Sequence, residues 1–134
     1  MEITLETVVF YFLAAFITVF SILTVTTHRM VRSATTKLGG GAAIKIMDHS
    51  VLCHREVVAR LRQLAAEKKI PAQDDLLKVG GTDAGVIHVS RGGVRTGGVS
   101  IPCRYTHSQT ELIDLADLEA CVKLVQAFCE SEFE

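Results

Sequence analysis

The stretch Ala43-Ile44-Lys45-Ile46-Met47, closed by Asp48-His49-Ser50, predicts a β-strand that ends in a turn. The alternation of apolar residues with Lys45 is typical of a strand with one buried face, and Asp, His and Ser favour the turn. Residues 54–69 then carry apolar side chains at helical spacing, and Pro71 ends that helix. The apolar positions of this helix are Val57, Val58, Leu61, Leu64 and Ala65.

The same change of period continues along the chain. Leu76–Val79 is a short apolar run stopped by glycines, and Thr82 is a plausible N-cap for a helix over residues 83–90. Residues 94–101 predict another strand, and Asp114 the N-cap of a final helix. The predicted buried face of that helix is Leu115, Leu118, Cys121, Val122, Val125 and Phe128. Strands alternating with helices predict an α/β fold with a partial, mostly parallel sheet and flanking helices.

Ahead of this pattern, residues 7–27 carry no charged side chain. A run of about 20 apolar residues is the length that a helix needs to cross a bilayer. The acidic start argues against a cleaved signal peptide, and Arg29 and Arg32 after the run favour a cytoplasmic flank. We therefore expect residues 1–35 to form a transmembrane anchor with a basic cytoplasmic flank, single-pass in the inner (cytoplasmic) membrane. Residues 36–134 would form one domain on the cytoplasmic side.

Charge and cysteine content exclude some classes of function. The net charge of −1 leaves no basic field for nucleic acid, so we expect no nucleic-acid partner. The four cysteines contain no C-x-x-C pair, which argues against a zinc knuckle or a disulfide framework and favours reduced, buried thiols.

Two loops could carry chemistry, Gly80–Gly85 and Ile101–Ser108. Both follow predicted strands at their carboxyl ends, which is the edge where α/β proteins place ligands. By pattern alone, Asp83 is more often a first-turn helix residue, and His107 more often an ordinary loop histidine.

Residues 37–128 carry several specific motifs in a fixed order. They are Leu38-Gly39-x-Gly41-Ala42-Ala43-Ile44, Ile46-x-Asp48, Ile70-Pro71-Ala72-Gln73, Gly80-Gly81-Thr82-Asp83-Ala84-Gly85 and Ser100-Ile101-Pro102-Cys103-Arg104-Tyr105-x-His107-Ser108. This stretch resembles the C-terminal portion of the glutamyl-aminopeptidase or deblocking-aminopeptidase family, metallopeptidases that are sometimes labelled cellulases or endoglucanases.

The resemblance implies two co-catalytic divalent metal ions, zinc or cobalt, and release of N-terminal residues from a peptide substrate. It makes His107 a metal ligand. It also assigns a substrate-binding surface, in which Arg104 and Tyr105 would position the ligand loop. The remaining residues of that surface, in the wall of the substrate cleft, would be Gly80, Gly81, Thr82 and Asp83.

The family's other metal ligand motif, His-x-Asp, and its Glu-Glu general base do not occur in this sequence. A catalytic zinc ion uses about three protein ligands, so one histidine cannot hold two metal ions. No residue of the chain therefore receives a catalytic role, and whether the chain is an enzyme is left open. We expect a truncated or chimeric metallo-aminopeptidase lobe that is inactive alone.

Two alternatives stay open. Residues 1–35 resemble the first transmembrane helix of subunit J of NADH-quinone oxidoreductase, so the chain could be a fragment of that membrane subunit. It could also be a membrane-anchored interaction module, including a homo-oligomer, because a partial sheet leaves strand edges and apolar surface exposed.

Overall fold

The computed structural model describes residues 5–32 and 36–132, and the chain divides into two units, residues 1–34 and 35–134. The first unit contains α1, Leu5–Arg32. Its described side chains, at positions 9 and 11–23, are exposed, and the rings of Phe16 and Phe20 stack with centroids 6.3 Å apart.

The predicted membrane anchor receives no support. Among the described residues, the structure offers no helix with the length and apolar character of a membrane span. The side chains of Arg29 and Arg32, which would form the basic flank, lie outside the described ones, as do residues 33–35 at the junction.

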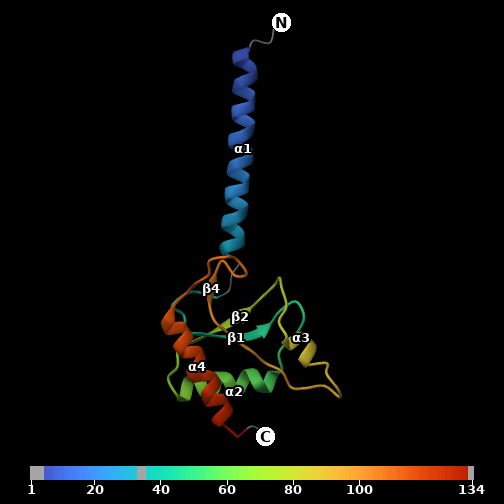
Figure 1. The fold of residues 1–134 in the computed structure, drawn as a ribbon, viewed down its shortest axis with the longest axis vertical. Coiled ribbons are helices and arrows are strands. Elements are labelled where there is room, and N and C mark those ends of the chain that lie inside the picture. Colours follow the sequence, from blue (N-terminus) through green and yellow to red (C-terminus); the bar gives the residue numbers. More distant parts are fainter. Residues whose placement is uncertain (1–4, 33–35, 133–134) are drawn as a thin grey trace. The chain divides into compact units, whose positions relative to one another are not determined.

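The second unit is built around β1, Ala42–Met47 (Figure 1). β2, Ala72–Leu76, pairs with it in parallel, and β3, Val99–Ser100, pairs on its other side antiparallel, giving the order β2-β1-β3. The α/β class is confirmed, but the prediction of a mostly parallel sheet is wrong. After β2 the chain forms a helix and a loop at the end of the sheet where β1 and β2 both finish. β3 starts from that end, so it runs in the opposite direction to β1 and β2.

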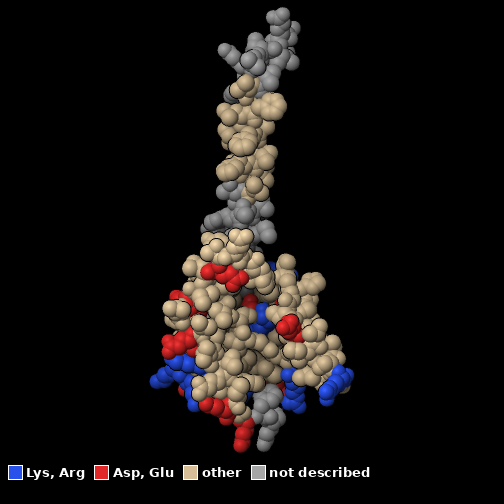
Figure 2. All heavy atoms as spheres, viewed as in Figure 1, with Lys and Arg blue, Asp and Glu red and all other residues tan. Residues whose placement is uncertain are grey.

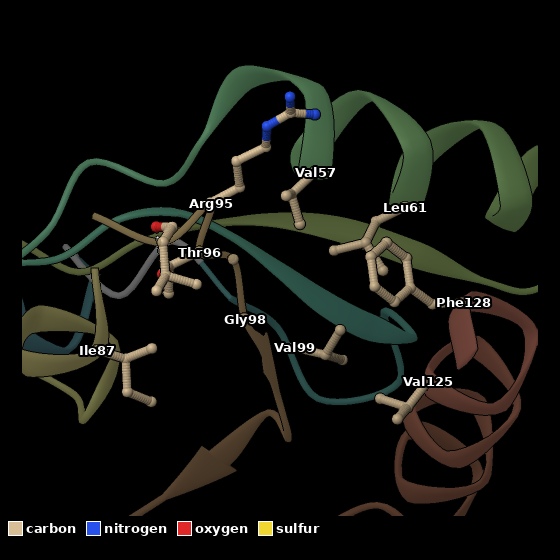
Figure 3. A pocket seen from close by; sticks show the side chains of 11 residues that line it. Val57, Leu61, Ile87, Arg95, Thr96, Gly98, Val99, Val125 and Phe128 are labelled. Carbon is tan, nitrogen blue, oxygen red and sulfur yellow. Dashed lines mark hydrogen bonds between the residues drawn. The ribbon is translucent and has the colours of Figure 1, made fainter. Parts of the chain in front are cut away.

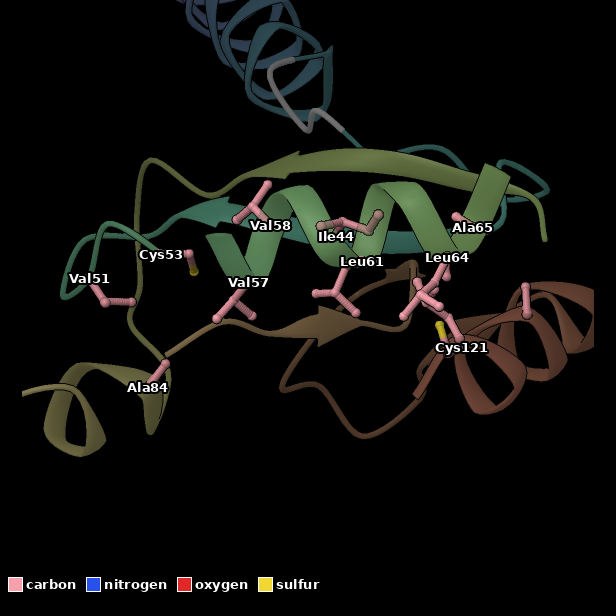
Figure 4. Close-up of a cluster of buried hydrophobic side chains, with 13 residues drawn as sticks. Ile44, Val51, Cys53, Val57, Val58, Leu61, Leu64, Ala65, Ala84 and Cys121 are labelled. Atoms are coloured by element: carbon pink, nitrogen blue, oxygen red, sulfur yellow. The ribbon is translucent and has the colours of Figure 1, made fainter. Parts of the chain in front are cut away.

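The helix that follows β1 is α2, Arg55–Glu67, close to its predicted bounds. Its buried residues are the five predicted from helical spacing, and they form the largest single contribution to the apolar core in Figure 4. The core is completed by Ile44 of β1 and by α4, Leu115–Glu130, which contacts both α2 and β1.

The buried face of α4 differs from the predicted one. Three of the large apolar residues placed in the core, Leu115, Val122 and Val125, are exposed. The helix instead turns mostly smaller residues toward β1, because small side chains let the helix backbone approach the strand closely. The residues of α4 that are buried are Asp117, Ala120, Cys121, Leu124 and Ala127.

The remaining elements are short. α3, Ala84–Ile87, covers only part of the helix predicted over residues 83–90. β4, Cys103–Arg104, and β5, Leu112–Ile113, form a separate antiparallel pair. β2 lies earlier in the chain than the strand predicted at Leu76–Val79. Because β2 contains polar residues, the apolar run that follows it was a misleading signal for the strand.

The cysteines follow their prediction in part. All four are free, and Cys53 and Cys121 are buried, whereas Cys103 is half-buried and Cys129 is exposed. Burial raises the pKa of the Cys53 and Cys121 thiols, which keeps them neutral at pH 7.

A buried carboxylate fixes the chain that leads into β1. Asp117 of α4 is 1% exposed, and its two oxygens accept hydrogen bonds from the backbone N–H groups of Gly39 (2.8 Å) and Gly41 (2.7 Å). Gly41 adopts a φ of +84°, and a Cβ there would lie 2.1 Å from the carbonyl oxygen of Pro71. The glycine run is therefore a tight turn that only glycine fits.

We predict that Asp117→Ala lowers the free energy of unfolding by about 2–4 kcal/mol, because two buried N–H groups lose their acceptor. Asp117→Asn keeps one carbonyl oxygen and should lose less. Urea unfolding of the full chain, followed by circular dichroism, measures both. The exposed Glu119→Ala on the same helix is the control and should leave the midpoint nearly unchanged; an equal loss there would contradict the assignment.

Candidate functional site

The Gly80–Gly85 loop is anchored to the end of β1 by one carboxylate. Oδ2 of Asp48 accepts a hydrogen bond from the Thr82 hydroxyl at 2.6 Å. Its Oδ1 accepts from the Ser50 N–H and hydroxyl, both at 2.7 Å, and from the Val51 N–H at 3.0 Å. Both oxygens of the buried Asp48 carboxylate thus accept hydrogen bonds, four in all.

These bonds determine the charge of Asp48. Burial alone would raise its pKa, but the hydrogen bonds from Thr82, Ser50 and Val51 outweigh burial and hold the pKa well below its ordinary value.

The prediction that Thr82 is a helix N-cap is wrong, because its hydroxyl donates to Asp48 instead. Asp83 occupies the N-cap position of α3, with no side-chain capping bond among the described residues.

The glycines of this loop permit close backbone contacts. Gly80 has a φ of +95°, and its carbonyl accepts a hydrogen bond from the His49 N–H at 3.1 Å. A Cβ on Gly81 or Gly85 would lie 2.8 or 2.3 Å from the Ser50 hydroxyl. The loop is thus held in one conformation by packing on the turn that follows β1.

His107 lies in the loop between β4 and β5, and its imidazole is exposed. Tyr105 and His107 both have a φ of +61°, which costs non-glycine residues about 1 kcal/mol or more each. The His107 N–H donates to Oε1 of Glu111 at 2.6 Å, which braces the loop.

The Arg104 side chain is bound by backbone carbonyl oxygens. Its guanidinium donates to the carbonyl oxygens of Cys103 at 2.9 Å and Thr36 at 3.3 Å. It therefore ties the hairpin to the segment that precedes β1, while the neighbouring Tyr105 side chain is exposed.

The two candidate loops lie at opposite ends of the sheet. Ser100 of β3 pairs with Ala43 near the start of β1, whereas Gly80 bonds to His49, just past its end. At about 3.3 Å per residue, this separation along β1 is roughly 20 Å. The prediction that both loops meet at one edge is wrong, because it assumed that β3 runs parallel to β1.

The residues present do not fit a two-metal centre. Within the described ranges, no group of three or more His, Cys, Asp or Glu side chains is placed to hold an ion. His107 offers one exposed imidazole, whereas a catalytic zinc ion uses about three protein ligands.

Sequence reasoning missed a buried ion pair between β1 and β2. Lys45 of β1 and Asp75 of β2 are direct partners in the parallel register, 4% and 6% exposed, and Nζ lies 2.5 Å from Oδ2. The Ser100 hydroxyl donates to the same Oδ2 at 2.9 Å. A lysine inside an apolar strand was the available signal, because a buried charge requires a partner.

An apolar groove of about 750 Å³ was also missed. It lies between α2, α4 and β3, with α3 at one end (Figure 3). The available signal was the Gly97-Gly98 break in the predicted strand. The apolar side chains that line the groove are Val57, Leu61, Ile87, Val94, Val99, Val125 and Phe128.

Known proteins are similar to this chain in sequence and in fold. The family model of the M42 glutamyl aminopeptidases matches residues 7–124. A candidate aminopeptidase of Acetivibrio thermocellus is 47% identical over 94 residues, which cover 69% of this chain and 28% of that protein. Aminopeptidase APDkam598 of Desulfurococcus kamchatkensis has a TM-score of 0.71 at 41% identity, covering 73% of this chain and 28% of its own.

A third similar structure is the TET1 peptidase of Pyrococcus horikoshii, which can assemble into a tetrahedron or a large octahedral shell. It has a TM-score of 0.63 at 33% identity and is covered over 27% of its length. The chain thus spans little more than a quarter of these relatives. The comparisons give no support to the resemblance of residues 1–35 to subunit J of NADH-quinone oxidoreductase.

We predict that Asp48→Asn lowers the free energy of unfolding at pH 7 by about 1–3 kcal/mol, because a charged acceptor of four hydrogen bonds is lost. The Asp48 carboxyl has a lower pKa in the folded chain than in the unfolded chain, where the pKa is about 4. It therefore stabilises the fold above about pH 4, and this stabilisation is lost as the pH falls further. The difference in the free energy of unfolding between wild type and Asp48→Asn should therefore become smaller below about pH 4. Urea unfolding between pH 2.5 and 7 measures it, with Asp83→Asn as control; a constant gap would contradict the account.

Proposed function

Because this chain belongs to the M42 glutamyl aminopeptidase family, we propose that its second unit serves as the C-terminal lobe of such an aminopeptidase and is inactive by itself. The observation that carries the proposal is the combination of a family match with a single candidate metal ligand, His107. The family reaction releases N-terminal residues from peptides with zinc or cobalt. This chain would supply part of the site, and residues outside it the rest.

The braced geometry of the hairpin supports the role proposed for His107. Its backbone adopts an uncommon φ and is bonded to Glu111, which holds the point from which the exposed imidazole extends. Arg104 would act as a positioning residue, because its guanidinium fastens the hairpin to Thr36. Tyr105, exposed beside it, is the proposed substrate-facing residue of this loop.

The Gly80–Asp83 segment is proposed as a wall of the substrate cleft. Its support is rigidity, since Asp48 and the turn at Ser50 hold Thr82 and the glycines in place. Asp83, exposed and free of a capping role in the described part of the chain, would carry the charge of this wall. Because the loop is roughly 20 Å from the hairpin end of β1, it would contact a different part of a substrate than His107.

Assembly is a further part of the proposal. The Pyrococcus horikoshii relative forms large shells, and a homo-oligomer of this chain would agree with the exposed apolar surface of its second unit. A binding role without hydrolysis is the second candidate function, favoured by the apolar groove between α2 and α4.

We predict no hydrolysis of leucine or glutamate p-nitroanilide by the purified full chain, with or without added zinc or cobalt. The physical reason is that a single imidazole cannot coordinate two metal ions. Release of p-nitroaniline at 405 nm measures the rate, and His107→Ala serves as the matched control with the same rate as wild type. Metal-dependent turnover that His107→Ala abolishes would show that this chain assembles the missing ligands.

A further inference from the structure

The apolar groove is open along the edge of the sheet. α2 contributes Val57 and Leu61, α4 contributes Val125 and Phe128, and Val99 of β3 lies between them (Figure 3). Val125, which lines this groove, is 46% exposed. In the described part of the chain, β3 is the last strand on this side of the sheet, so one of its edges faces the groove unpaired.

A glycine lets the chain approach α2 closely at the groove. A Cβ on Gly97 would lie 2.4 Å from Cγ1 of Val57, so the backbone there packs directly on α2. A Cβ on Gly98 would instead lie 3.5 Å from Cβ of Lys45, on the opposite face of the sheet. Gly97 is thus required by the contact between this segment and α2.

The groove carries almost no net charge. Of the described residues that line it, Arg95 alone is charged, and its guanidinium lies 2.9 Å from the Glu56 carboxylate. On the face shown in Figure 2, charged side chains lie mainly along the margins of the second unit, with a few near its middle. The chemistry of the surface therefore fits an apolar polypeptide segment rather than a charged ligand.

A second copy of the chain does not fit this groove through a two-fold contact of the groove with itself. In a two-fold dimer the same patch meets itself, so a 750 Å³ hollow would face another hollow and leave a large void. The occupant must be convex. The similar aminopeptidases are about three and a half times longer than the stretch they share with this chain, so most of their fold lies in residues that this chain does not match.

We propose that this groove docks an apolar segment from the part of an M42-type aminopeptidase fold that these residues do not supply. The segment adds a strand beside β3 and seats aliphatic side chains between Val57, Leu61, Val125 and Phe128. This inference rests on the proposed function, because it names the partner that would complete the lobe.

The test co-expresses the full chain with a defined probe, the Acetivibrio thermocellus relative from which the 94 matched residues are deleted. Each carries its own affinity tag, and native mass spectrometry of the purified material gives the stoichiometry. We expect a 1:1 complex. Co-expression lets a probe that is unstable alone fold on its partner, so failure to recover the complex overturns the proposal.

Two variants locate the contact. Val125→Asp places a charge in the groove, so it should weaken the complex at least tenfold while thermal unfolding of the free chain stays close to wild type. Val122→Asp is the matched control, since Val122 is 59% exposed on the same helix but does not line the groove. Equal weakening by Val122→Asp, or none by Val125→Asp, overturns the proposed surface. A homodimer of the chain alone that Val125→Asp disrupts would assign the groove to a second copy.

The outcome separates docking from catalysis. His107→Ala should leave the complex intact, because His107 lies in the β4–β5 hairpin and does not line the groove. A stable complex without His107-dependent hydrolysis would uphold docking and refute the metal-ligand role. Hydrolysis by the chain alone would refute the proposed function whatever the groove binds.

Discussion

The carboxylate of Asp117 is the interaction on which the second unit depends. It lies in the last helix and holds the turn before the first strand, so it joins the two ends of the unit through buried hydrogen bonds to Gly39 and Gly41. β1 begins directly after that turn, and both neighbouring strands pair with it. If α4 moved away from this turn, β1 would lose both its fixed start and its cover.

A second buried charge sets the register of the sheet. The Lys45–Asp75 pair costs desolvation energy, and pairs of this kind contribute little net stability compared with apolar side chains. A shift of one residue between β1 and β2 would, however, leave an unpaired buried ion, which is far more costly. The pair, with Ser100 on the same carboxylate oxygen, therefore makes one arrangement of all three strands much better than its neighbours.

Local features of the fold were predictable from the sequence, and long-range ones were not. The buried face of α2 and the Asp114 N-cap, whose Oδ1 accepts from the Ala116 N–H at 2.9 Å, depend on residues a few positions apart. The direction of β3 depends on how a 22-residue stretch after β2 crosses the sheet, which no local pattern encodes. The face of α4 was misjudged because periodicity favours the largest apolar residues, whereas the contact with β1 selects small ones and a carboxylate.

The candidate site divides in the same way. The motifs that contain His107 and Thr82 were recognisable, but their separation followed from strand direction alone. An extended peptide covers at most about 3.6 Å per residue, so a chain bridging both loops needs about six residues. A single amino acid or a dipeptide could touch only one of them. Because β3 returns antiparallel to β1, simultaneous contact with both loops demands a molecule at least that long.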